Sequence, residues 1–515
     1  MRNRYLITLL AAATGLAGCS QNQRQQEAAT QPAADSTAAT LTTTATPAGI
    51  TPVDMPNPQI PGYRFPAPQA SIDQWVQAGQ ADSISLHGWG IWAALTTPTA
   101  QVHNADTLRV YETWTTPQEV AAALQQPAAQ PTKSVHLTRQ ARPLKRFLRT
   151  PRQFSRDEQL MGQLKAAHAP NTASMDSNAV FESVYYSPAT ARHAHDNKLL
   201  LKSTLDKLLA DGQTDIPAFP SNAVAIKPVY EVVPGPQRSR GLYRMKVWAN
   251  IPASLKTKPQ GFPQSQWTSC VYVDVRNQGR GNGQVLNGCG PATPQTTYNL
   301  RDFIYHTLTA DEAQALYQEA LRNKQIGPNV RPYAAGDYAI LVAMHITSRE
   351  IQRWTWQTMW WAPNPDQVPE PSNPAVVAAR PKQLRGAPRH YGMGIAYQMI
   401  SPVQPLTGGS NKGTSIYVYN PYLEAPFTPA AFNQVGTVIT NGLTVTNNVG
   451  MRTNCMSCHG QANYNPKSLS TGLGYVGDTY VDLNAPGFKG TLKVDFLWSI
   501  NDDAVADKRP AQAAR

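Results

Sequence analysis

The chain has 515 residues, of which 41% are hydrophobic and 15% are charged, and its formal net charge is +12. This composition excludes a globally disordered chain and leaves enough apolar residues for a large core. The length alone corresponds to roughly two to four domains of about 150 residues. Prolines (43) outnumber glycines (34) and long helical patterns are few, so we expect a β-rich α+β fold, built as one large globule or as two subdomains.

Residues 1–18 have the pattern of an export signal, in which a basic start precedes an apolar run over 5–13. The run is shorter than the about 20 residues that a membrane span needs, and no later segment has the pattern of a transmembrane helix. The sequence LAGC, ending at Cys19, resembles the lipobox of bacterial lipoproteins. That resemblance implies lipidation of Cys19, and Ser20 implies an outer-membrane destination. An ordinary cleaved signal and an uncleaved anchor are the alternatives.

The rest of the chain divides by composition into four segments. Residues 19–58 are rich in Ser, Thr, Ala, Gln and Pro, and we expect them to form a disordered tether. An N-terminal α+β region follows over 59–335, with its folded part beginning near Pro61. A β-rich region covers 336–503, and residues 504–515 form a tail that we expect to fray.

Local patterns predict individual elements within these regions. We expect a strand from Ile84, a second strand from Leu108 that leads into a helix after Pro117, and two further helices. One of these is capped by Asp196 and stopped by Gly212, and the other has a capping box at Thr309 and Glu312. The remaining predicted strands lie within 241–251, 270–276, 337–348, 351–363 and 414–424.

Trp354, Trp356 and Trp360 recur at period two and therefore share one face of a predicted strand. These rings form either a wall of the core or the lining of a cofactor pocket. Upstream, residues 133–156 hold eight Lys and Arg and no acidic residue. This basic run either steers an acidic redox partner, or contacts anionic groups of the membrane, or is a solvated connection.

The pattern C-x-x-C-H at Cys455, Cys458 and His459 carries the chemistry of the chain. Two thiols at this spacing can form thioethers with the vinyl groups of a haem, and the adjacent imidazole can then ligate the iron. A zinc site would need a second ligand pair at similar spacing, and a thioredoxin-like dithiol would need a βαβ setting. A redox dithiol and another metal remain the alternatives.

The stretch CMSCHGQA over 455–462 resembles the attachment motif of c-type cytochromes. The resemblance implies one covalent haem c, bound through Cys455 and Cys458, with His459 as the proximal iron ligand. It covers only the motif and its surroundings, so it is specific for haem but not for a physiological role. With Cys19 and the motif assigned, Cys270 and Cys289 remain, and in an oxidising compartment we expect them to form a disulfide rather than two buried thiols.

The sequence departs from ordinary class I cytochromes c on the distal side of the haem. No Met or His follows His459, so any distal ligand must come from upstream. Met393, between two glycines, is the first candidate, with His390 and Met399 beside it. Met344 and His345 are secondary candidates for the distal ligand. If none ligates, the iron is five-coordinate.

Three functions are compatible with these residues. The first is a c-type cytochrome, tethered to the outer membrane and facing the periplasm, that transfers electrons through one haem. The second is a haem-dependent oxidoreductase, or a gas- or peroxide-binding protein, with an open distal iron site. The third is an envelope binding module with an accessory haem. The expected partners are a periplasmic redox protein, acidic if the basic run steers it, and the membrane through the N-terminal lipid. A soluble periplasmic protein is the alternative, and we expect no nucleic acid.

Overall fold

The computed structural model describes residues 49–126, 144, 146–151, 179–237, 242–432, 449–466 and 478–507, and the backbone of strands at 437–440 and 443–446. These residues all belong to one unit, Pro47–Arg515, with a mixed α+β fold, as predicted. The signal segment, Cys19 and most of the expected tether lie outside the described residues. Among the described residues, no helix has the length and apolar character that crossing a membrane requires.

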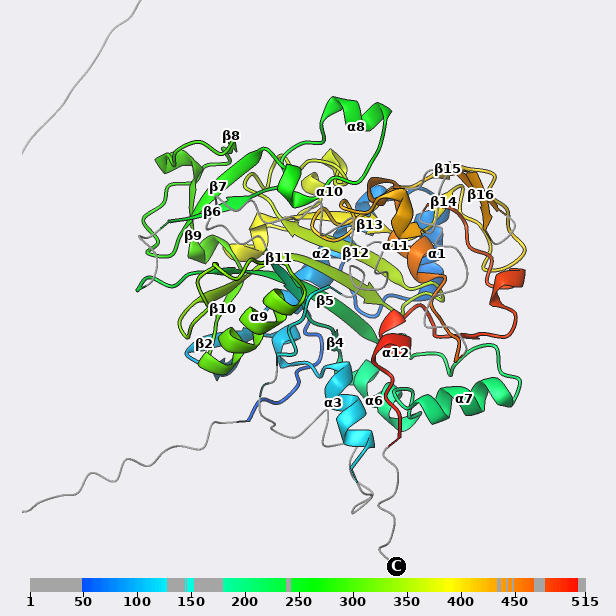
Figure 1. Ribbon diagram of the computed structural model, residues 1–515. Helices are drawn as coiled ribbons and strands as arrows, with labels where there is room; N and C mark the ends of the chain where they lie inside the picture. The colour runs from blue at the N-terminus through cyan, green and yellow to red at the C-terminus, as the bar shows by residue number, and fades with distance from the viewer. Residues whose placement is uncertain are drawn as a thin grey trace, which may run out of the picture. The chain divides into compact units, whose positions relative to one another are not determined.

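An antiparallel seven-stranded sheet runs through the centre of this unit (Figure 1). Its main path is β13-β12-β11-β5-β3. In addition, β10 pairs with the first residues of β11, and β4 pairs with the beginning of β5. Runs of buried Val, Ile, Ala and aromatic residues explain why these segments form central strands, since both faces of the sheet are covered. The strands are β3 (Val180–Glu182), β4 (Tyr185–Tyr186), β5 (Val224–Val233), β10 (Tyr305–Thr307), β11 (Tyr338–Ser348), β12 (Thr355–Trp361) and β13 (Tyr391–Ala396).

The register gives this sheet two distinct faces, because residues paired across antiparallel strands point the same way. Thr347 pairs with Trp356, and Met359 pairs with Met393. Trp356 and Met359 are an odd number of positions apart on β12, so they face opposite ways. Helix α2 (Ala81–Thr96) covers the Met393 face, where a Cβ added to Gly88 would lie 3.0 Å from the Met393 sulfur. We call the Trp356 side the pocket face.

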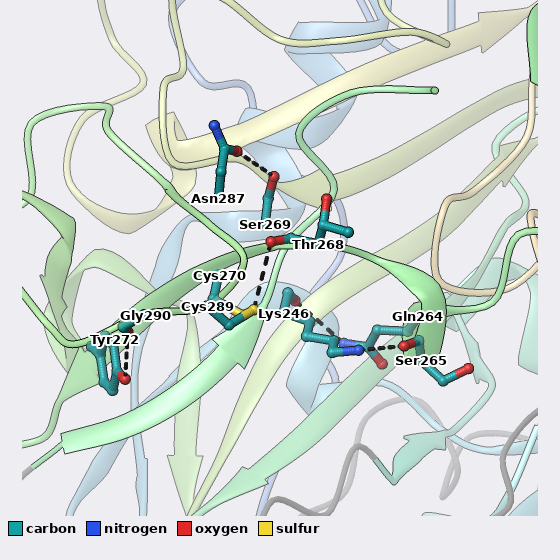
Figure 2. The surroundings of a disulfide bond; sticks show 10 residues. All are labelled: Lys246, Gln264, Ser265, Thr268, Ser269, Cys270, Tyr272, Asn287, Cys289 and Gly290. Atoms are coloured by element: carbon teal, nitrogen blue, oxygen red, sulfur yellow. Dashed lines mark hydrogen bonds between the residues drawn. A yellow bond between two sulfur atoms is a disulfide. The ribbon is translucent and has the colours of Figure 1, made fainter. Parts of the chain in front are cut away.

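A second sheet carries the disulfide (Figure 2). Cys270 on β7 and Cys289 just beyond β8 are joined, with their Cα atoms 5.0 Å apart, which is the predicted pairing. The sheet has the path β6-β7-β8, with β9 parallel to β7. Its strands are β6 (Leu242–Lys246), β7 (Ser269–Asp274), β8 (Leu286–Asn287) and β9 (Thr297–Asn299).

The described part of the chain also has four two-stranded ribbons, ten α-helices and several short 3-10 helices. The ribbons are β1 (Pro98–His103) with β2 (Asp106–Arg109), β14 (Ile400–Ser401) with β15 (Thr414–Ser415), β16 (Thr437–Thr440) with β17 (Leu443–Thr446), and β18 (Asn463–Tyr464) with β19 (Leu492–Lys493). Besides α2, the helices are α1 (Gln69–Gln77), α3 (Pro117–Leu124), α6 (Pro188–Asp196), α7 (Lys202–Ala210), α8 (Ala253–Thr257), α9 (Ala310–Arg322), α10 (Pro374–Ala378), α11 (Cys455–His459) and α12 (Trp498–Asp503).

Two helix predictions are confirmed and one is partly wrong. Helix α3 follows Pro117, and α9 has its capping box, in which the Glu312 N–H donates to Thr309 and the Glu312 carboxylate accepts from the Thr309 N–H at 2.9 Å. Asp196, the predicted cap, instead ends α6, and α7 begins at Lys202. Gly212 follows α7 with φ of +80°, the left-handed conformation that ends helices.

Two strand predictions are wrong, and a third is largely wrong. Of the strand expected from Leu108, only Leu108 and Arg109 belong to a strand, and Val110–Thr113 form a 3-10 helix. The segment from Ile84 belongs to α2, whose aromatic and glycine residues are buried on all sides, so the helix has no polar stripe that a pattern could detect. Of residues 414–424, only Thr414–Ser415 form a strand. Asn420 explains part of this, because its side-chain amide donates to Thr358 Oγ1 at 2.8 Å and to the Met359 carbonyl at 3.0 Å, which fixes an irregular loop against β12.

The expected boundaries shift at three places. Ile50 is buried and the Val53 N–H donates to Thr113 Oγ1, so residues 49–58, which we expected to belong to the tether, pack on the fold. Strands on both sides of the 335/336 boundary share one sheet, because β5 pairs with β11. At the other end, Val505 forms a bridge with Leu201, which ties residues 504–507 down, and residues 508–515 lie outside the described part.

Candidate functional site

The helix α11 displays the C-x-x-C-H motif on one of its faces. Cys455, Cys458 and His459 are at positions i, i+3 and i+4, which coincide on a helix surface. Asn454 starts the helix by accepting hydrogen bonds from two backbone N–H groups of the first turn, at 2.9 and 3.2 Å. The Asn454 amide donates to the Ile416 carbonyl at 2.8 Å, so the helix is anchored to the neighbouring loop. Figure 1 shows α11, in orange, next to β12 and β13.

His459 is held in one tautomer and one orientation. Its Nδ1 lies 2.9 Å from the carbonyl oxygen of Phe496. Because a carbonyl can only accept, Nδ1 carries the hydrogen and the ring lone pair is on Nε2, the arrangement of a histidine that ligates a metal. The ring of Trp356 packs on the imidazole, with centroids 4.1 Å apart. Asp495 and Phe496 have φ of 44° and 67°, an unusual conformation for residues other than glycine that turns this carbonyl toward His459.

A pocket opens between α11 and the pocket face of the central sheet. Its cavity volume is about 150 Å³, and the space continues into solvent at the pocket mouth. Both motif cysteines and His459 line it, opposite residues of β5, β11 and β12. The apolar lining residues are Val184, Ala225, Ile226, Ile346, Trp356, Val418, Phe427, Leu497 and Trp498.

Of the three tryptophans predicted to share a face, only Trp356 lines this pocket. Trp360 is fully buried in the core of the same sheet. Trp354 precedes β12, packs on Phe219 and donates its indole N–H to Asp495 at 3.2 Å. The prediction of a pocket lining is therefore right for Trp356, and the prediction of a core wall is right for Trp360.

The environment of Cys455 disfavours thiolate chemistry. Burial raises the pKa of the Cys455 thiol well above its ordinary value, and the charges of Glu424 and Cys458 raise it further. The Cys455 Sγ lies 3.4 Å from the Val418 carbonyl, to which it can donate. A reactive dithiol requires the opposite, a lowered pKa in electropositive surroundings.

The register places Met393 on the wrong side of the sheet to reach the pocket. It pairs with Met359 on β12, and Met344 on β11 pairs with the same residue. All three sulfurs therefore lie on the face covered by α2. Met393, the first distal candidate of the sequence analysis, is separated from His459 by the sheet itself.

His390 and Met399 also fail to line the pocket. His390 ends the short helix η6 (Ala387–His390) and stacks on Trp361, which is on the α2 side of β12. Met399 touches the motif helix at Gly460, yet its sulfur accepts a hydrogen bond from the Val481 N–H at 3.2 Å. Neither is placed to complete a haem site, because neither faces the cavity.

His345, a secondary candidate in the sequence, does line the pocket, together with Glu424. His345 Nε2 and a Glu424 carboxylate oxygen are 3.2 Å apart. Burial alone would raise the pKa of Glu424, but the charge and hydrogen bond of His345 and the charge of Lys227 hold it below its ordinary value. Sequence reasoning missed Glu424, whose only signal is a carboxylate within the apolar segment 414–424, which we predicted to be a strand.

A charged network forms another wall of the pocket. Glu182 pairs with Lys227 at 3.1 Å and with Arg149 at 3.6 Å, and Arg149 also pairs with Asp503 at 3.0 Å. Arg146 is buried near Glu112 and Glu312. At these two arginines the interpretation of the basic run as a solvated connection is wrong, and the other six basic residues of the run lie outside the described part.

No group of three or more Cys, His, Asp or Glu side chains arranged for a metal ion occurs among the described residues. Comparison with protein-family models, with curated proteins and with solved structures finds no match to this chain. The case for a function therefore rests on the residues of the pocket and on the motif that they surround.

Proposed function

We propose that this chain is a haem c protein, with Cys455 and Cys458 bonded to the two vinyl groups and His459 Nε2 as the proximal iron ligand. The observation that carries the proposal is the combination of two thiols and a correctly oriented imidazole on one face of α11, all lining one pocket. The Phe496 carbonyl accepts the hydrogen bond from His459 Nδ1 that orients a ligating histidine.

The rest of the pocket fits the same group. A porphyrin needs apolar walls for its ring and cations for its two propionates. The walls of the pocket are mostly aliphatic and aromatic, and Arg149 and Lys227 are within the lining. Their side chains are 17% and 22% exposed and pair with Glu182, and in the proposed complex they would also contact the propionates.

A redox dithiol fits less well than a haem. The raised pKa of the Cys455 thiol disfavours the thiolate that such chemistry needs. Thioether formation with a vinyl group does not require a stable thiolate in the folded protein. A buried environment that raises the pKa of a thiol is therefore compatible with a cysteine that reacts only once, when the haem is attached during maturation.

Electron transfer is the function that we assign to this centre. A bound haem carries one electron by cycling between its ferric and ferrous states. We place the protein in the periplasm, anchored to the outer membrane by lipid on Cys19, where it exchanges electrons with a periplasmic redox partner. The chain's own contribution is to bury the ring and fix His459.

A catalytic or ligand-binding haem is the second candidate. Its support is the number of ionisable groups in the pocket, since Glu182, Lys227, His345 and Glu424 exceed what an electron carrier needs. Groups of this kind can deliver or accept protons for a molecule bound at an open iron. This function requires a vacant distal position and therefore predicts a high-spin iron that binds carbon monoxide.

The test is a pyridine haemochrome assay on the full chain, produced in the periplasm of a strain that matures haem c. We expect covalent haem with two thioethers in the wild type, a changed thioether count in Cys455→Ser and Cys458→Ser, and no change in the matched double control Cys270→Ser/Cys289→Ser. A wild-type protein without covalent haem, or Cys458→Ser with two intact thioethers, would refute the assignment. The absorption spectrum with and without carbon monoxide then distinguishes the two functions, because only an open iron binds this ligand.

A further inference from the structure

His345 is the histidine that the central sheet brings to the pocket from the strand side. On β11 it lies two residues before Thr347, and Thr347 pairs directly with Trp356 on β12. His345 is therefore the diagonal neighbour of Trp356 on the pocket face, at about 7–8 Å between backbones. Trp356 packs on the ring of His459, and both histidines line the same cavity as this indole.

Glu424 fixes the orientation of His345. Its carboxylate accepts from His345 Nε2 at 3.2 Å and from the Asn420 backbone N–H at 2.7 Å. The loop that carries Glu424 is in turn bonded to β12 through the buried Asn420 amide. Because the carboxylate accepts at Nε2, a neutral His345 keeps its lone pair on Nδ1. A carboxylate behind an imidazole is the usual support of a metal-ligating histidine and increases its basicity.

We propose that His345 is the second axial ligand of the haem iron and that Glu424 is the positioning residue that holds it. This inference rests on the proposed haem site, and it corrects the choice of distal ligand made from the sequence. Met393 and Met344 are on the opposite face of the sheet, and His390 and Met399 do not line the pocket. Two imidazole ligands would make the iron low-spin, which favours the electron carrier over the open-iron enzyme.

The experiment begins with the haemochrome assay, which reports the proposed function independently of the distal ligand. If covalent haem is absent, the haem assignment fails; if it is present, the spin state tests His345 alone. We expect the wild type to be low-spin, indifferent to carbon monoxide, and to show the electron paramagnetic resonance signature of two histidine ligands. His345→Ala should lose the low-spin spectrum and bind carbon monoxide, and added imidazole should restore the low-spin form.

Two controls separate ligation from folding. Met393→Leu and His193→Ala should leave the low-spin spectrum unchanged, since Met393 lies behind the sheet and His193 lies on α6, outside the pocket lining. If His345→Ala fails to fold, His345→Met provides the second variant, and we expect it to replace the two-histidine signature with that of histidine and methionine.

Glu424 needs a readout that a purely structural role would not change. Glu424→Gln removes the negative charge that supports His345, so we expect a higher midpoint potential of the haem. Carbon monoxide should also displace His345 more easily, with an apparent affinity about 10- to 100-fold higher than in the wild type. The exposed Glu370→Gln is the matched control. A wild-type protein that has covalent haem but is high-spin, or a His345→Ala variant with an unchanged spectrum, would overturn the proposal.

Discussion

Glu231 provides a quantitative test of the described core. It lies on β5 and is fully buried. Its Oε1 accepts a hydrogen bond from Gln264 Nε2 at 2.6 Å, whereas its Oε2 has no hydrogen-bond partner among the described residues. Burial raises the pKa of Glu231 from 4.5 to about 7, although the hydrogen bond from Gln264 acts in the opposite direction.

The sign of the pH effect follows from these two values. Between them, the folded protein retains the proton on Glu231 and the unfolded chain has released it. The stability that the protonated carboxyl contributes is therefore fully present below pH 4.5 and is lost as the pH rises through about 7. The interval between 4.5 and about 7 corresponds to about 3 kcal/mol in the free energy of unfolding.

Glu231→Gln removes this dependence, because glutamine has nearly the same shape and does not ionise. We expect the stability of the variant relative to the wild type to increase by about 3 kcal/mol between about pH 4.5 and about pH 7.5, measured by urea denaturation. The exposed Glu370→Gln should show no such trend. A difference between Glu231→Gln and the wild type that stays constant over this range would refute the reasoning.

Three further substitutions test the fold by urea denaturation. Cys270→Ala with Cys289→Ala should lower the free energy of unfolding by about 3 kcal/mol, because the bridge spans 19 positions of the chain and restricts the unfolded state; a loss near zero would contradict this. Trp356→Ala should cost about 3–5 kcal/mol, since the indole is buried against His459, and Trp356→Phe should cost clearly less. Gly450→Ala should destabilise strongly, because an added Cβ would lie 1.5 Å from the carbonyl oxygen of Glu424; wild-type stability in that variant would show that this contact is wrong.

The parts of the fold that were predictable depend on local chemistry. The capping box of α9 requires only Thr309 and Glu312 at the right spacing. The strand β11 is recognisable from its apolar run up to Met344, and β12 from tryptophans that recur at period two. Helix α2 was not predictable, because a helix buried on all sides lacks the polar stripe that separates helix from strand. Its glycines serve packing, as Gly90 shows by leaving no room for a Cβ beside the Tyr63 ring.

The candidate site divides in the same way. Its proximal half is local: Cys455, Cys458 and His459 lie within five consecutive residues, so the sequence alone identifies them. Its distal half is a consequence of register. Met344 and His345 are neighbours in the sequence, and only the pairing of β11 with β12 decides that His345 faces the pocket and Met344 does not.

A shift of one residue in that register would exchange the two side chains and present a thioether instead of an imidazole to the pocket. Thr347 opposes this shift, because it lies opposite Trp356 and its hydroxyl donates to the Thr355 carbonyl at 2.9 Å. The β11–β12 pairing thus determines more than stability. If His345 ligates the iron, the same contacts that seat Trp356 against His459 also select the chemical identity of the second ligand, and hence whether the centre carries electrons or binds a substrate.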